Sequence, residues 1–132
     1  MLIAEDEVLV RQVCHAVLAA EGYAILIAAS GRGALEISRA FPGEIHLLLS
    51  DIRMPGMDGW QVRDILVTER PGIRVLLMSG NAEEPTDPRS FLRKPFLIDD
   101  LRDRVRHLLE GSAAAGAGKT DSQIPPWSHA NS

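Results

Sequence analysis

The chain has 132 residues, of which 45% are hydrophobic and 24% are charged, and its formal net charge is −4 at pH 7. This length and composition suit one globular domain, and the acidic balance argues against a basic nucleic-acid-binding surface. Cys14 is the single cysteine, which excludes an internal disulfide and a cysteine-based zinc site. We find no apolar run of membrane-spanning length and no signal peptide, so we expect a cytoplasmic protein without nucleic-acid or membrane partners.

Short apolar runs alternate with segments of helical periodicity along the first 110 residues. The runs lie at 2–4, 24–29, 45–49 and 75–78, with a weaker one at 91–92. They do not alternate polar with apolar residues, which is typical of strands buried on both faces. The other segments carry core-facing stripes at Val10, Val13, Cys14, Val17 and Leu18; Ala34, Ile37 and Phe41; Val62, Ile65 and Leu66; and Ile98, Leu101, Val105, Leu108 and Leu109. Strands that alternate with helices predict βαβ units and a parallel sheet.

Two further signals mark boundaries. Gln61 follows Asp58 by three residues, which resembles a capping box and predicts the start of a helix. Residues 111–132 are rich in Gly, Ala, Ser and Pro, so we expect a disordered tail after a domain at 1–110. The AAAGAGKT phrase in this tail fits a relaxed P-loop pattern, but a P-loop follows a strand, and here a helical segment precedes it. We therefore do not predict nucleotide binding.

Polar side chains follow four of the apolar runs. Glu5 and Asp6 come after the first run, Asp51 after the third, Ser79 after the fourth and Lys94 after the last. Because ligands of doubly wound sheets bind beyond the carboxyl ends of the strands, we expect these side chains to converge. Two like charges 4 Å apart repel by about 4 kcal/mol at an effective dielectric of 20, so the carboxylates need a cation. Mg²⁺ binds well to such a cluster of oxygens. The Lys94 ammonium and the Ser79 hydroxyl can donate hydrogen bonds to phosphoryl oxygens.

Together these residues resemble the receiver (CheY-like) domain of two-component response regulators. The resemblance covers nearly all of residues 1–110 and is strongest in the phrase LLLSDIRMPGMDG at 47–59. It implies an α/β fold, the flavodoxin-like doubly wound type. In that fold a five-stranded parallel sheet has the strand order 2-1-3-4-5 and helices on both faces.

The function that this resemblance implies is a phosphorylation switch in a two-component system or phosphorelay. Asp51 would accept a phosphoryl group from a histidine kinase or a histidine phosphotransfer protein. Asp6 and Asp51 would bind Mg²⁺ directly, together with the main-chain carbonyl of Arg53. Glu5 would act mainly through a water. No catalysis beyond self-phosphorylation and self-dephosphorylation is expected, and Arg53 and Asn81 would flank the water that hydrolyses the phosphoryl group.

The resemblance also implies how the switch changes its surface. Lys94 and Ser79 would hold phosphoryl oxygens, and an inward movement of Ser79 would let Phe91 turn inward. This movement would alter the face that meets a downstream protein, which the sequence does not identify. The remaining family-like positions are the turn residues Pro55 and Gly59, and Pro95 in a cis bond after Lys94.

Two features depart from the family pattern. Only 15 positions separate Ser79 from Lys94, and the intervening segment contains Pro85 and Pro88, which oppose a helix. We therefore expect the fourth helix of the family to be missing or reduced to a turn, with an open loop over Phe91. The second departure is that residues 111–132 are too few and too polar to fold alone, so we expect no effector domain in them. The chain then acts by protein contact, or it is the detached receiver of a hybrid histidine kinase.

Two other functions remain as alternatives. The first is a receiver-like docking module that works without phosphorylation, which dependence on Asp51 would distinguish. The second is a phosphatase of the haloacid dehalogenase type, which also uses an aspartate after a parallel strand. That chemistry requires a second aspartate two positions later, where this chain has Arg53.

Overall fold

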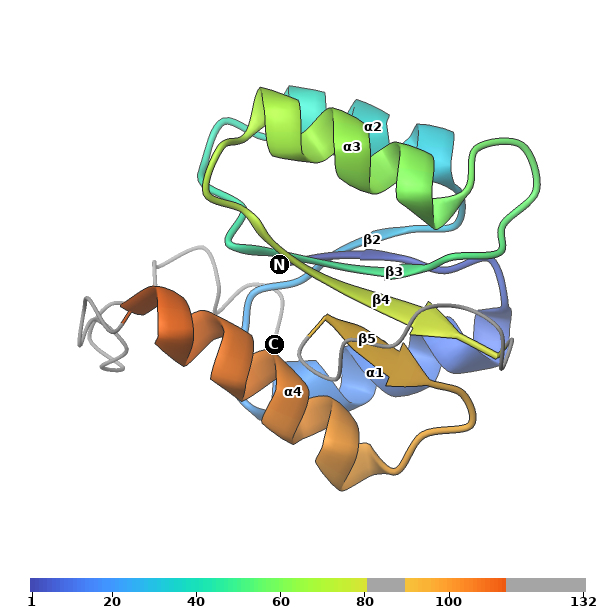
Figure 1. Cartoon of the computed structure of the whole chain (residues 1–132), viewed down its shortest axis with the longest axis vertical. Coiled ribbons are helices and arrows are strands. Elements are labelled where there is room, and N and C mark those ends of the chain that lie inside the picture. Colours follow the sequence, from blue (N-terminus) through green and yellow to red (C-terminus); the bar gives the residue numbers. More distant parts are fainter. Residues whose placement is uncertain (81–89, 114–132) are drawn as a thin grey trace.

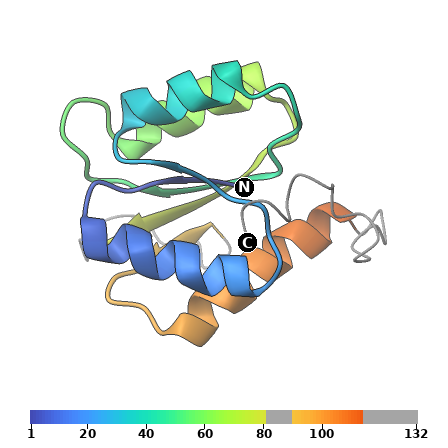
Figure 2. The same ribbon diagram turned by 180° about the vertical axis from the view of Figure 1, so that it is seen from behind.

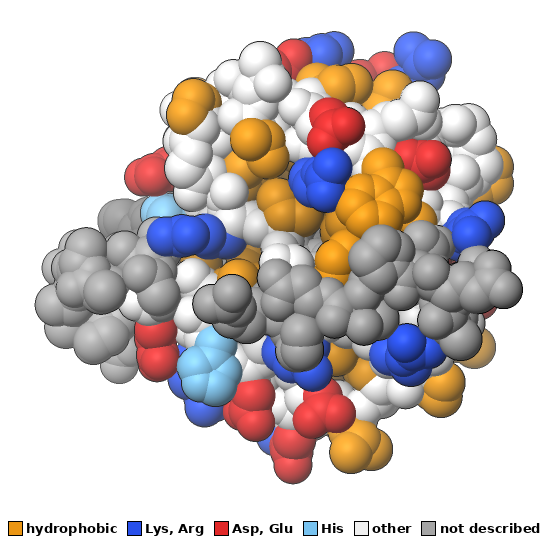
Figure 3. All heavy atoms as spheres, in the orientation of Figure 1, with side chains coloured by type: hydrophobic (Ala, Val, Ile, Leu, Met, Phe, Trp, Pro, Cys, Tyr) orange, Lys and Arg blue, Asp and Glu red, His pale blue; other side chains and the backbone are white. Residues whose placement is uncertain are grey.

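The computed structural model of the chain describes residues 1–80 and 90–113, with side chains to residue 110. This part of the chain forms three layers, in which a parallel sheet lies between two pairs of helices (Figures 1 and 2). In the ranges described, no helix is long and apolar enough to cross a membrane. Charged side chains of both signs are interspersed on the face in Figure 3, with apolar side chains gathered over the upper helical layer.

The sheet has five strands, all parallel. They are β1 (Leu2–Ala4), β2 (Leu26–Ala28), β3 (Leu47–Asp51), β4 (Arg74–Ser79) and β5 (Phe91–Arg93). Their spatial order is β2-β1-β3-β4-β5, which confirms the predicted fold class. After β1 the chain runs to β2 at one edge of the sheet, and it then returns to β3 on the other side of β1. In this topology, the crevice at the carboxyl ends of β1 and β3 is where ligands bind.

The four described helices lie two on each face of the sheet. Helices α1 (Val8–Ala20) and α4 (Ile98–Ala113) cover one face, and α2 (Gly31–Ala40) and α3 (Gly59–Glu69) cover the other. Their apolar stripes build two core layers, one around Cys14, Leu18 and Leu101 and one around Val62 and Leu66. The predicted capping box is present. The Asp58 carboxylate accepts from Gln61 N at 2.9 Å, and the Gln61 amide oxygen accepts from Asp58 N at 3.0 Å.

Several predicted core positions face solvent instead. Val13 is 42% exposed and Ile98 is 49% exposed, although both belong to apolar stripes. Ile98 is the first residue of α4, at the end of the helix, and Val13 lies on the part of α1 that the sheet and α4 leave uncovered. Ile27 is 38% exposed because β2 is an edge strand, so the prediction of burial on both faces is wrong there.

The boundaries differ from the prediction at the two ends of the functional region. Strand β3 extends through Asp51, so this residue ends the strand rather than following it. Helix α4 continues to Ala113, three residues beyond the predicted domain end at 110. The tail is predicted to be disordered over 111–132, but residues 111–113 belong to α4. The rest of the tail, 114–132, and nearly all of the segment 81–90, where we expect no full helix, lie outside the described residues.

Candidate functional site

Three carboxylates meet at the carboxyl ends of β1 and β3. These strands are neighbours, with Ala4 opposite Ser50, so the residues that follow β1 face the end of β3. One carboxylate oxygen each from Glu5, Asp6 and Asp51 lies within 4.8 Å of the others. The sheet topology therefore brings together the acidic residues that the sequence placed at separate strand ends.

Glu5 is the most buried member of this cluster, with no exposed surface. Its Oε2 accepts a hydrogen bond from Glu7 N at 3.0 Å. Burial raises the pKa of the Glu5 carboxyl to about 7, and the Asp51 charge acts in the same direction, against the Glu7 amide and Lys94. The carboxylate of Glu5 is thus held in a place where its ionised form needs a cation.

Lys94 supplies positive charge at the same place. Its Nζ lies 3.1 Å from Glu5 Oε1, 3.2 Å from Asp51 Oδ2 and 3.2 Å from Glu7 Oε1. Burial alone would lower the pKa of the ammonium, but Glu5 and Asp51 outweigh it, so the pKa lies above its usual value. Lys94 follows β5, and its main-chain N donates to Ser79 O at 2.8 Å. The peptide bond to Pro95 is cis.

The predicted switch residues lie on the neighbouring strands. Ser79 ends β4 and is 5% exposed, and Phe91 begins β5. The ring of Phe91 is 5.5 Å from the ring of Trp60 on α3, centroid to centroid, and the Arg63 guanidinium lies 4.7 Å from the Trp60 ring. Trp60 was not among the predicted site residues. Its only signal was an aromatic residue in the first turn of a helix, in a chain with 5% aromatics.

Gly59 allows α3 to begin directly against the end of β3. A Cβ at this position would lie 2.4 Å from Asp51 O and 2.8 Å from Ile52 Cα, both of which are backbone atoms that cannot easily move. The amide of Gly59 donates to Ile52 O at 2.8 Å. A glycine is therefore required here by close approach, which gives a physical reason for the residue in the predicted turn.

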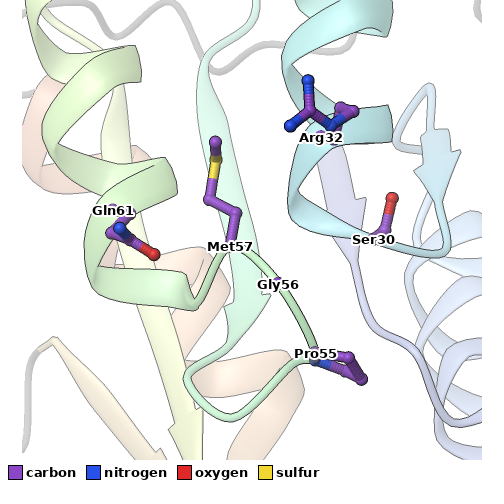
Figure 4. Close-up of a pocket in the computed structure, with 6 residues that line it drawn as sticks. All are labelled: Ser30, Arg32, Pro55, Gly56, Met57 and Gln61. Carbon is purple, nitrogen blue, oxygen red and sulfur yellow. The ribbon is translucent and has the colours of Figure 1, made fainter.

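Pro55 lines a shallow pocket of about 530 Å³ beside this turn. The pocket lies between the start of α2 and the loop that leads into α3 (Figure 4). Its lining residues are Ser30, Arg32, Pro55, Gly56, Met57 and Gln61. None of them belongs to the acidic cluster, so the pocket is separate from the site. Arg53, the predicted source of a main-chain ligand, is exposed in the same loop.

The residues present fit a hard divalent cation. The cluster offers only oxygen ligands, which is the donor set that such ions prefer. Glu5 Oε1 is buried and accepts no hydrogen bond from the described residues, with the Lys94 ammonium as its charged neighbour. A buried carboxylate oxygen in this state is costly without a positive partner. A second cation beside Lys94 would offset the remaining charge of Asp6 and Asp51.

Comparison with known proteins decides the family. The family model described as "Response regulator receiver domain" matches residues 1–106. The chain belongs to this family. This receiver domain is therefore a component of two-component signalling, in which receiver domains interact with histidine kinases or phosphotransfer partners. The family comprises signalling phosphoacceptors.

Two curated relatives illustrate the range of proteins that contain such a domain. The chain is 38% identical over 117 residues to sensor kinase CckA of Brucella abortus, covering 83% of this chain and 12% of that protein. It is 32% identical to sporulation initiation phosphotransferase F of Bacillus subtilis, covering 83% of this chain and 92% of that protein. The receiver domain thus spans a small part of one relative and nearly all of the other.

Solved structures agree with the fold. The receiver domain of the hybrid histidine kinase CckA matches with a TM-score of 0.66 at 38% identity, over 82% of this chain and 96% of that one. The response regulator TrrA of Thermotoga maritima, solved in complex with Mg²⁺ and BeF, matches with a TM-score of 0.72 at 28% identity. The match covers 82% of this chain and 96% of that one.

Proposed function

We propose that this receiver domain accepts a phosphoryl group on Asp51 with the help of Mg²⁺ and thereby switches a protein-contact face. The observation that carries the proposal is the position of the Asp51 carboxylate. It ends β3, lies 3.2 Å from the Lys94 ammonium through Oδ2, and shares a cluster with Glu5 and Asp6. A carboxylate so placed can act as a nucleophile toward phosphorus.

The donor in this proposal is a phosphohistidine of a histidine kinase or a histidine phosphotransfer protein. A carboxylate oxygen of Asp51 attacks the phosphorus, a new P–O bond forms, and the P–N bond to the imidazole breaks. The imidazole leaves with the electron pair and takes up a proton. Lys94 and Ser79 hold the oxygens of the transferred group, and the ammonium neutralises part of its charge.

The same acidic cluster would hold the metal ion. We propose that Asp6 and Asp51 bind Mg²⁺ directly with the main-chain carbonyl of Arg53, while Glu5 acts through a water. When bound, the ion neutralises charge on the phosphoryl oxygens as they pass between donor and acceptor. Because Glu5 is buried and its pKa is about 7, a nearby cation also favours its ionised form.

The output would come from the edge of the sheet that carries β4 and β5. Ser79 ends β4, and Phe91 begins β5 against Trp60 of α3. We propose that Ser79 moves toward the phosphoryl group and that Phe91 turns with it, which changes the surface offered to a downstream protein. The likeness to the CckA receiver supports a second form of the proposal, in which this domain belongs to a hybrid kinase.

The test is phosphorylation by acetyl phosphate, with and without Mg²⁺, followed by intact mass. We expect the native protein to gain one phosphoryl group only when Mg²⁺ is present, and Asp51→Asn to gain none. The contrary result is no gain in either protein together with no Mg²⁺ binding by titration. That result would favour a docking module that works without phosphorylation.

A further inference from the structure

Glu7 lies at the start of α1, in a position where the side chain usually caps the helix. It is the N-cap residue, with extended backbone angles (φ −83°, ψ 121°), yet its side chain makes no capping hydrogen bond. Serine, threonine, aspartate and asparagine are the residues that stabilise this position, whereas glutamate is not among them. A residue whose type does not suit its local position, here a helix N-cap, often has a functional role instead.

The Glu7 side chain turns to Lys94 instead. Its Oε1 accepts a hydrogen bond from Lys94 Nζ at 3.2 Å, although the side chain is 63% exposed. Its main-chain N donates to Glu5 Oε2 at 3.0 Å. Glu7 therefore contacts both a buried carboxylate and the ammonium of the site, one through its backbone and the other through its side chain.

Lys94 has three carboxylate neighbours and three N–H donors. A phosphoryl group on Asp51 brings further acceptor oxygens to the same ammonium, so these oxygens compete with the carboxylates that Lys94 already contacts. Glu5 is fully buried and Asp51 carries the phosphoryl group itself. The exposed carboxylate of Glu7 is the one that water can solvate after release, so its release costs least.

We infer that Glu7 is a positioning residue that holds Lys94 in the unphosphorylated domain and competes with the phosphoryl group for its ammonium. This inference rests on the proposed function. Removal of the Glu7 charge then has two effects, and both strengthen the binding of a phosphoryl group or its mimic. It frees a donor of Lys94, and it removes a negative charge from the path of an anionic group.

The first test measures binding of beryllium fluoride, a mimic of the phosphoryl group, in the presence of saturating Mg²⁺ by isothermal titration calorimetry. We expect Glu7→Gln to bind it roughly two- to fivefold more tightly than the native protein, as fits the strength of an exposed ion pair. Glu36→Gln is the matched control, because it removes one exposed charge on α2, on the other face of the sheet. This control should bind as the native protein does.

The second measurement, the affinity for Mg²⁺ alone, tests whether the variant changes beryllium fluoride binding through the metal ion. Loss of a negative charge near the acidic cluster can only leave the affinity for Mg²⁺ alone unchanged or weaken it. Tighter beryllium fluoride binding without tighter Mg²⁺ binding therefore does not arise from the metal site. Glu7→Ser provides an independent variant, because serine can also cap α1 and should not lower the melting temperature.

The outcomes distinguish this inference from the proposed function. If the native protein binds beryllium fluoride and Glu7→Gln binds it equally or more weakly, the inference is wrong and the proposed function stands. If both glutamine variants tighten binding alike, net charge explains the effect and the inference is again wrong. If the native protein does not bind beryllium fluoride with Mg²⁺, the proposed function itself fails.

Discussion

At the scale of single residues, Glu5 carries the strongest electrostatic conflict in the site. It is fully buried, and it lies in one cluster with Asp6 and Asp51. Its pKa is raised to about 7 from an ordinary value of 4.5, with burial as the main cause. The folded state therefore binds a proton at Glu5 more tightly than the unfolded state does, and folding stability depends on pH through this residue.

The sign of this dependence gives a prediction for Glu5→Gln. Below pH 4.5 the carboxyl is protonated in both states, and its preference for the protonated form adds to stability. This contribution is lost as pH rises to 7, because the ionised carboxylate is then buried. With EDTA present, we expect the variant to gain melting temperature over the native protein between pH 5 and pH 8. Calorimetric scans at the two pH values measure this gain.

A difference in melting temperature between the two proteins that stays constant across this pH range would contradict the prediction. Glu36→Gln serves as the control, since Glu36 is exposed on α2. Loss of its charge should leave the pH dependence of the melting temperature unchanged. Addition of Mg²⁺ at pH 8 should narrow the difference, because a bound cation stabilises the ionised form of Glu5 only in the native protein.

The sequence placed Glu5, Asp6, Asp51 and Lys94 at strand ends, and parallel pairing alone brings such ends to one edge. That part of the site was predictable from periodicity and spacing. Glu7 was not, because its role depends on a side chain that turns away from its own helix toward a residue 87 positions later. Local propensity describes what Glu7 would do in an isolated helix, and tertiary contacts override it.

At the scale of elements, Arg70 connects the ends of α2 and α3. It is the C-cap residue of α3, and its guanidinium donates to Ser38 Oγ, Ser38 O, Phe41 O and Gly43 O at 2.8–2.9 Å. Three of these acceptors are main-chain carbonyls at or just beyond the end of α2, where helical partners run out. The role of Arg70 could not be predicted from the sequence, because its partners lie about 30 positions earlier and periodicity does not reveal them.

We expect Arg70→Ala to lower the free energy of unfolding by about 2–3 kcal/mol, since hydrogen bonds to a charged donor are the strong ones and the freed carbonyls are partly buried. Arg39→Ala is the matched control. Its ion pair with Glu69 at 2.7 Å joins the same two helices but lies in solvent, so its loss should change stability far less. Urea unfolding of both variants measures the difference, and equal effects would refute the role of Arg70.

At the scale of the whole molecule, the sheet edge that carries the acidic cluster is linked through the strands to Trp60 on α3. Asp51 ends β3, Ser79 ends the adjacent β4, and Phe91 begins β5 with its ring against Trp60 of α3. The contact places one tryptophan next to the residue that the proposed switch would move. The other tryptophan is Trp127. The emission of Trp60 is thus a direct measure of whether chemistry at Asp51 reaches α3.

We expect the fluorescence of a Trp127→Phe variant to change in intensity or wavelength when acetyl phosphate and Mg²⁺ are added together. The physical reason is that a rotated Phe91 leaves the Trp60 ring in a different environment, since the two centroids are 5.5 Å apart. The additional substitution Asp51→Asn should abolish the fluorescence change. Phe91→Leu should reduce the fluorescence change, while its intact mass should still show the added phosphoryl group. If the mass shows a phosphoryl group and the emission stays constant, then Phe91 does not move on phosphorylation, and the output of this domain has to arise on another face, such as that of α1 and α4.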